Sequence, residues 1–145
     1  MGTDLNEGGI RIDHRRVVGG AIPQLRRTEP FQSSSAESSR TLVDDLLVTI
    51  AAIADGVEHN LPPDQVVANQ DVRRAIARYA GVYRKRGLPP TGVIHAYQIL
   101  RQTALLSLES QSKQVKCSGT DAFALARQLS ALFDRVTRAA LEDYS

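Results

Sequence analysis

The sequence lacks several features that mark secreted and membrane proteins. Cys117 is its only cysteine, so no intramolecular disulfide can form, which fits a reducing compartment. No apolar run approaches the roughly 20 residues of a membrane-spanning helix. The first nine residues, MGTDLNEGG, have neither the cationic start nor the apolar centre of a signal peptide. We therefore expect a cytoplasmic protein that makes no membrane contact.

Aromatic residues are also scarce. They make up 5% of the chain, there is no tryptophan, and hydrophobic residues amount to 42%, so the core is mostly aliphatic. A length of 145 residues suits one domain. The formal net charge of +2 gives no general reason to expect a nucleic-acid partner.

Catalytic motifs are absent too. The sequence contains no nucleophile elbow, P-loop, dinucleotide fingerprint or paired carboxylates, so we predict that the protein is not an enzyme. His14, His59 and His95 lie in three separate segments, and none is matched with a second ligand at metal-binding spacing. We expect no metal and no cofactor. His95 could be weighed as a haem ligand, but a hydrogen-bonded histidine is the favoured interpretation, and Cys117 is interpreted as a solvated thiol.

Apolar residues recur at intervals of three and four along most of the chain. This period predicts an all-α fold, a helical bundle with four principal helices and no strands. The predicted helices run from near Thr41 to about Gly56, from Asp71 to Gly87, from Pro90 to Glu109, and from about Thr120 through Tyr144. Thr41 and Asp44 have the spacing of a capping box at the first of these starts.

The N-terminal part, residues 1–37, is expected to be a separate segment before a helical domain at 38–145. Residues 1–9 show no periodicity and are predicted to be disordered. Residues 10–27 contain an apolar pattern interrupted by Gly19, Gly20 and Pro23, so they form either a docked helix or a loop. Residues 28–39 are rich in serine and predict a flexible connector.

Local signals also mark the turn between the second and third predicted helices. Gly87 follows the last periodic residue and suits a left-handed helix ending, with Leu88 supplying the apolar contact. Pro90 can begin the next helix because a first-turn amide needs no helical partner. Asp64 or Asn69 can cap the helix that leads into this turn.

This pair of helices carries a family resemblance. Gly87, then Tyr97, Leu100 and Arg101, resemble the paired-helix pattern of the N-terminal domain of RsbT co-antagonist proteins, also found at the front of bacterial sensor histidine kinases. The closing segment LFDRVTRAALEDY is similar to the family's last helix, so the likeness covers residues 40–144. The sequence departs from the pattern by having the less polar residues Tyr79, Tyr83 and Ala96. The resemblance implies a globin-like or bundle-like regulatory domain that binds no haem, relays a signal and often dimerises.

Two groups of residues are candidate sites. Tyr79, Tyr83, Tyr97 and Arg101 are expected to lie close together, either around a ligand pocket or in a packed helix interface, which is the interpretation that we favour. The stretch 73–86 carries six basic residues and could lie along a phosphate backbone, although a solvated face is favoured. Its basic residues are Arg73, Arg74, Arg78, Arg84, Lys85 and Arg86.

The last predicted helix has more apolar residues than one buried stripe needs, which predicts a homodimer. The candidate interface residues are Leu125, Leu129, Leu132, Phe133 and Val136. A monomer in which residues 10–27 cover this surface is the alternative.

The sequence thus predicts a non-enzymatic regulatory or sensory domain of the bacterial stress-response or sensor-kinase type, which relays a signal through helix packing and dimerisation. Expected partners are a kinase, another signalling protein or an output domain. The chain is either a standalone adaptor or a piece of a longer protein. The alternative is a small DNA-binding regulator that uses the basic helix at 73–86.

Overall fold

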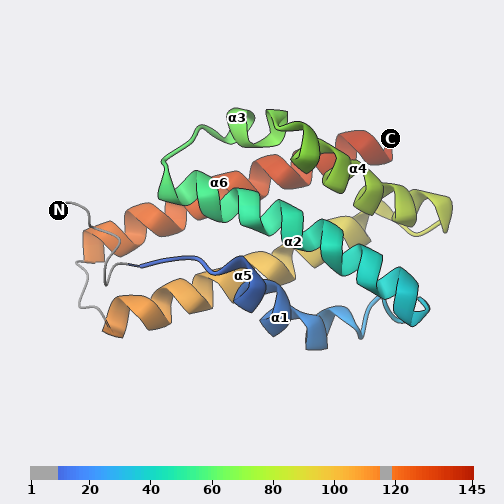
Figure 1. Ribbon diagram of the computed structural model, residues 1–145, viewed down its shortest axis with the longest axis horizontal. Coiled ribbons are helices and arrows are strands. Elements are labelled where there is room, and N and C mark those ends of the chain that lie inside the picture. The colour runs from blue at the N-terminus through green and yellow to red at the C-terminus, as the bar shows by residue number, and fades with distance from the viewer. Residues whose placement is uncertain (1–9, 115–118) are drawn as a thin grey trace.

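The computed structural model describes residues 10–114 and 119–145, and all regular secondary structure in these two ranges is helical (Figure 1). This confirms the all-α helical bundle. The four principal helices are present, together with an N-terminal helix and one short helix that the sequence did not predict. The elements are α1 (His14–Leu25), α2 (Ala36–Glu58), α3 (Pro63–Ala68), α4 (Gln70–Lys85), α5 (Pro90–Gln114) and α6 (Gly119–Tyr144).

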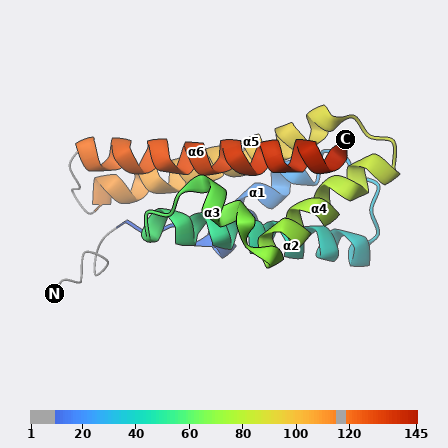
Figure 2. The same cartoon turned by 90° about the horizontal axis from the view of Figure 1, so that it is seen from above.

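The helices form two sides around one core. Figure 2 shows α5 and α6 running along one side of the molecule, with α2, α3 and α4 on the other. Helix α4 packs against α2 and α6, and α6 also contacts α2, α3 and α5. Within the described ranges α6 therefore touches every helix except α1. None of the helices in these ranges is both long and apolar enough to cross a membrane.

Helix α1 lies within residues 10–27, where the sequence left a helix and a loop open. Asp13 caps it by accepting hydrogen bonds from the backbone amides of Arg15 and Arg16. Pro23 lies inside the helix, where it has no amide hydrogen to donate to the carbonyl four residues earlier. That carbonyl belongs to Gly19, which is exposed. The helix packs on α2 and α5 rather than on α6. The monomeric alternative required residues 10–27 to cover the last helix, and α1 does not do so.

The start of α2 differs from the prediction. The helix begins at Ala36, and its cap is Ser35, whose Oγ accepts the amide hydrogen of Ser38 at 3.1 Å. The predicted start near Thr41 is wrong because Thr41 already lies in a formed turn, where its Oγ1 donates to the carbonyl of Glu37. The flexible connector is also wrong, since the side chain of Phe31 is buried in the core.

The turn between α4 and α5 has the predicted geometry. Gly87 has φ +69°, the amide of Leu88 donates to the carbonyl of Tyr83, and the amide of Gly87 donates to that of Arg84. This is the bonding pattern of a left-handed glycine ending. Pro90 begins α5. At the other end of α4 the cap is Asn69, which accepts hydrogen bonds from two backbone amides.

Gly87→Val is expected to lower the free energy of unfolding by more than about 1 kcal/mol, because a β-branched residue resists the left-handed backbone that this turn requires. Urea unfolding followed by circular dichroism measures the change. Gly81→Ala is the matched control on the same helix, where a Cβ meets nothing within 4 Å. That control should gain up to about 1 kcal/mol from helix propensity. Equal stability of Gly87→Val and the parent would contradict the turn assignment.

Candidate functional site

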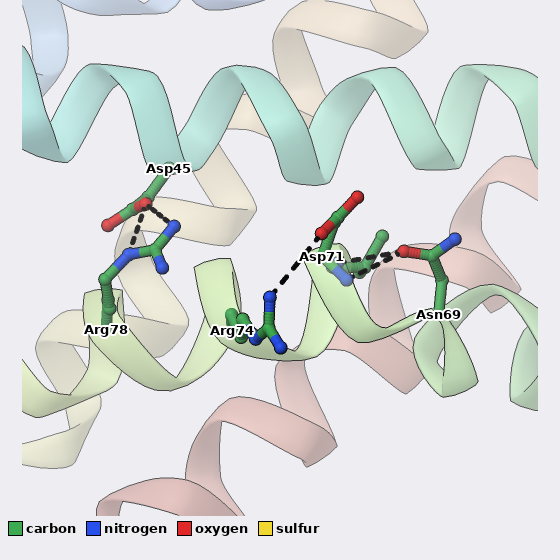
Figure 3. Close-up of polar contacts among 6 residues, drawn as sticks. Asp45, Asn69, Asp71, Arg74 and Arg78 are labelled. Atoms are coloured by element: carbon green, nitrogen blue, oxygen red, sulfur yellow. Dashed lines mark hydrogen bonds and ion pairs between the residues drawn. The ribbon is translucent and has the colours of Figure 1, made fainter.

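A buried carboxylate joins α2 to α4. Asp45 lies on the face of α2 that faces the core, one turn from Leu42 and Thr49, and is 4% exposed. Arg78 reaches it from α4, donating from Nε at 3.0 Å and from Nη2 at 2.8 Å to the same oxygen, Oδ1 (Figure 3). The hydrogen bonds and charge of Asp45 raise the pKa of Arg78. The Arg78 side chain is 56% exposed.

This pair is asymmetric, which determines its effect on stability. An ionised carboxylate in the interior is costly unless it is paired and hydrogen-bonded. The partly exposed Arg78 retains water on one side, whereas Asp45 has lost most of its water. Arg78 therefore compensates the buried charge and fixes how α2 and α4 are placed along one another.

Three tyrosines, two from α4 and one from α5, pack together in the core. Tyr79, Tyr83 and Tyr97 are each 1% exposed. The hydroxyls of Tyr79 and Tyr83 are 3.2 Å apart, and the ring of Tyr79 lies 5.4 Å from that of Tyr83 and 5.7 Å from that of Tyr97. Tilted rings at these distances are a favourable aromatic arrangement. The cluster thus joins α4 to α5.

Burial determines the ionisation of these tyrosines. It raises the pKa of Tyr83 to about 12 and raises the pKa of Tyr79 well above its ordinary value. The pKa of Tyr97 is raised first by burial and then by the charges of Tyr83 and Asp45. The hydroxyl of Tyr97 has no hydrogen-bond partner among the described residues. The hydroxyl of Tyr97 is therefore a buried polar group of α5 that none of the described residues satisfies.

The fourth predicted member of this group, Arg101, points elsewhere. It is 3.8 Å from Asp134 of α6 and its side chain is 36% exposed. The structure therefore brings the three tyrosines together but not the arginine. A close approach at Gly92 helps to position the cluster, since a Cβ there would lie 2.8 Å from the ring of Tyr83.

A pocket of about 510 Å³ lies between α2 and α4. From α2 it is lined by Ser38, Thr41, Leu42 and Asp45. Helix α4 and the residue that follows it, Arg86, contribute small and apolar residues together with four cations. These lining residues are Ala77, Gly81, Val82, Arg78, Arg84, Lys85 and Arg86. The sequence analysis missed both the pocket and Asp45. The sequence did contain a signal for Asp45, which is a charged residue among the apolar residues on the buried face of α2.

The histidines require one correction. His59 does share a helix face with a carboxylate, because its Nε2 lies 3.2 Å from Oδ1 of Asp55. Glu58 completes a group of three, all exposed, in the part of the chain that the structure describes. Exposed groups of this kind are common without a metal, so we assign no site here. His95 is exposed, and Cys117 lies outside the described residues.

The basic stretch does not form a nucleic-acid surface with interleaved aromatics. Tyr79 and Tyr83 are buried, so neither can stack on a base. Arg78 is bound to Asp45, and Arg86 donates to the carbonyl of Pro30 and to Oγ of Ser34. The DNA-binding alternative is not supported.

The single chain buries most of the predicted dimer-interface residues of α6. Leu129, Leu132, Phe133 and Val136 are each at most 2% exposed, and Leu125 is partly buried. Helix α6 contacts four other helices, and these buried residues form its side of the contacts. The exposed large apolar side chain on α6 is Phe123, at 64%.

Removing either partner of the α2–α4 ion pair should have unequal effects. Arg78→Met is expected to lower the free energy of unfolding by on the order of 2 kcal/mol, because it leaves the buried carboxylate unpaired. Asp45→Asn should cost roughly half as much, because the freed arginine can turn to solvent. Arg74→Met, which loses only a 4.0 Å contact with Asp71, is the control and should change little. If Asp45→Asn costs as much as Arg78→Met, the asymmetry is absent.

Comparison with known proteins identifies the family. A search of curated proteins and a search of solved structures found no match. The family model described as the RsbT co-antagonist protein rsbRD N-terminal domain matches residues 16–145. The match begins earlier than the resemblance at residues 40–144, so it includes nearly all of α1. A match over most of a six-helix domain is a much stronger indication than the short motifs. The chain belongs to the family of RsbT co-antagonist rsbRD N-terminal domains, a family of signalling domains.

Proposed function

We propose that this chain is a non-enzymatic sensory domain in which the α2–α4 pocket receives a signal and α6 carries it to a partner. The observation that supports this most directly is the position of the pocket. It lies beside the Asp45–Arg78 pair, which holds α2 against α4. A ligand in this pocket would contact the residues that fix the packing of the two helices.

A hydrogen bond at the turn after α4 connects this interface with the end of α6. Arg86 lines the pocket and lies two residues before Leu88, whose carbonyl accepts a hydrogen bond from the hydroxyl of Tyr144. The left-handed residue Gly87 lies between them. A shift of α4 along α2 would therefore move the residue to which the last turn of α6 is bound. Because packed interfaces change between discrete arrangements rather than deform continuously, a small shift can be passed on.

The proposed partners are a kinase, another signalling protein or an output domain that contacts α6. The proposed location is the cytoplasm. The domain would act on such a partner by changing the surface that the partner binds. In this mechanism the domain has two conformations, and both the signal and the partner shift the equilibrium between them.

We also propose that the protein is a homodimer, with Phe123 of α6 at the contact. This side chain is exposed and carries Arg127 over its ring at 5.8 Å. Light scattering on the full chain should give twice the monomer mass, and Phe123→Ser should shift the equilibrium toward monomer. Val48→Ser, at a 37% exposed position on α2, is the control. A full chain that stays monomeric at high concentration would exclude the dimer.

The relay is tested by filling the pocket without a ligand. Gly81 lines the pocket, and a Cβ there meets nothing within 4 Å, so Gly81→Leu adds a side chain to this space without an immediate clash. Backbone amide chemical shifts of the folded variant should change in the last turns of α6 as well as in α2 and α4. Gly19→Leu is the control, because Gly19 is also helical and open but lies on α1. Changes confined to α2 and α4 would contradict the relay.

A further inference from the structure

We propose that the α2–α4 pocket binds a small organic anion, a carboxylate or phosphate monoester with a short apolar part. This inference rests on the proposed function, because it names the chemistry of the signal that the pocket would receive. Four cationic side chains and one carboxylate line the pocket. The charge balance therefore favours a negative ligand.

The carboxylate does not cancel this balance. Asp45 is 4% exposed and already accepts two hydrogen bonds from Arg78 on one oxygen. A guanidinium has five N–H donors. Arg78 uses one on Nε and one on Nη2 to bind Asp45, so the two on Nη1 remain for another acceptor. Arg78 can thus hold Asp45 and still donate to a ligand from its exposed side.

Among the described residues, no carboxylate neutralises the other three cations. Within the described residues, Arg84 and Lys85 form no ion pair. Arg86 is held in place by two neutral acceptors, the carbonyl of Pro30 at 3.0 Å and Oγ of Ser34 at 2.8 Å. Its charge is therefore positioned but not compensated, and a charge-assisted hydrogen bond to a carboxylate or phosphate is stronger than one between neutral groups.

The rest of the lining suits a short apolar part. Leu42, Ala77 and Val82 give the pocket an apolar surface, and Gly81 leaves space beside the helix backbone. The hydroxyls of Ser38 and Thr41 add polar atoms from α2. A volume of about 510 Å³ is within the usual range for small-molecule sites.

Amide chemical-shift titration of the full chain at physiological ionic strength tests this assignment. The probes are hexanoate, hexyl phosphate, hexanol and hexylamine, which share an alkyl body and differ in head group. Saturable shifts around Arg84 and Gly81 are expected for the two anions and not for hexanol or hexylamine. The relative affinities of hexanoate and hexyl phosphate then distinguish a carboxylate from a phosphate ligand.

Two variants separate binding in the pocket from attraction to surface charge. Gly81→Leu keeps every cation and removes space, whereas the double variant Arg84→Gln, Lys85→Gln keeps the space and removes two charges. Each should weaken anion binding by about tenfold or more, which is about 1.4 kcal/mol. The control is Arg73→Gln, Arg74→Gln, which removes two exposed charges of α4 that do not line the pocket, and it should bind like the parent.

Three results would overturn the inference. They are no saturable binding of either anion, equal or tighter binding of hexanol or hexylamine, and anion binding unchanged by Gly81→Leu. None of these results would by itself refute the proposed function, because the relay test with Gly81→Leu needs no ligand. Conversely, anion binding without changes in α6 would support the pocket assignment and contradict the relay.

Discussion

The buried charge of Asp45 is the constraint on which the contact between α2 and α4 depends. A carboxylate that has lost its water must be paired, and Arg78 is the residue that reaches it. The pairing fixes one position of α4 along α2. The pocket lies beside this contact. Tyr79 and Tyr83 are also on α4, and Tyr79 packs against Tyr97 of α5. A change at the ion pair would therefore affect two neighbouring interfaces.

Helix α6 is bound to several of the helices that it touches by polar contacts as well as by apolar packing. Arg135 donates to Asp64, at the start of α3, at 2.7 Å, and Gln128 donates to the carbonyl of Gly56 in α2 at 3.2 Å. The absence of a side chain at Gly56 permits this approach, since a Cβ would lie 2.9 Å from Val66 and 3.3 Å from Leu132. The last helix is thus placed to respond to movement of α2, α3 or α4.

Local signals predicted much of this fold. The left-handed ending at Gly87 was predicted correctly, and Asn69 is one of the two cap residues that the sequence offered. Both features depend on a few neighbouring backbone groups. The start of α2 was predicted wrongly, because its cap, Ser35, lies in a serine-rich stretch whose composition resembles that of a connector. Burial of Phe31 against the core holds that stretch in place, and tertiary packing of this kind cannot be inferred from composition.

The site was less predictable than the helices, for a physical reason. The tyrosines could be grouped because one helical face and a tight turn bring them together. Arg101 was grouped with them by helical spacing, but its guanidinium lies near Asp134, on a helix that is distant in sequence. The ion pair and the pocket depend on how α2 is placed against α4. The spacing of apolar residues within each helix does not determine this placement. In the same way, several apolar residues of α6 that suggested a dimer are buried by four neighbouring helices.

A double-mutant cycle between Arg78 and Tyr144 tests the central claim, that the α2–α4 contact is energetically coupled to the end of α6. Free energies of unfolding would be measured for Arg78→Met, Tyr144→Phe and the double variant, with Arg74→Met in place of Arg78→Met as the control cycle. Independent sites usually add within roughly 0.3–0.5 kcal/mol. Coupling predicts an interaction energy above about 0.5 kcal/mol for Arg78 and none for Arg74. Additive effects in both cycles would contradict the account.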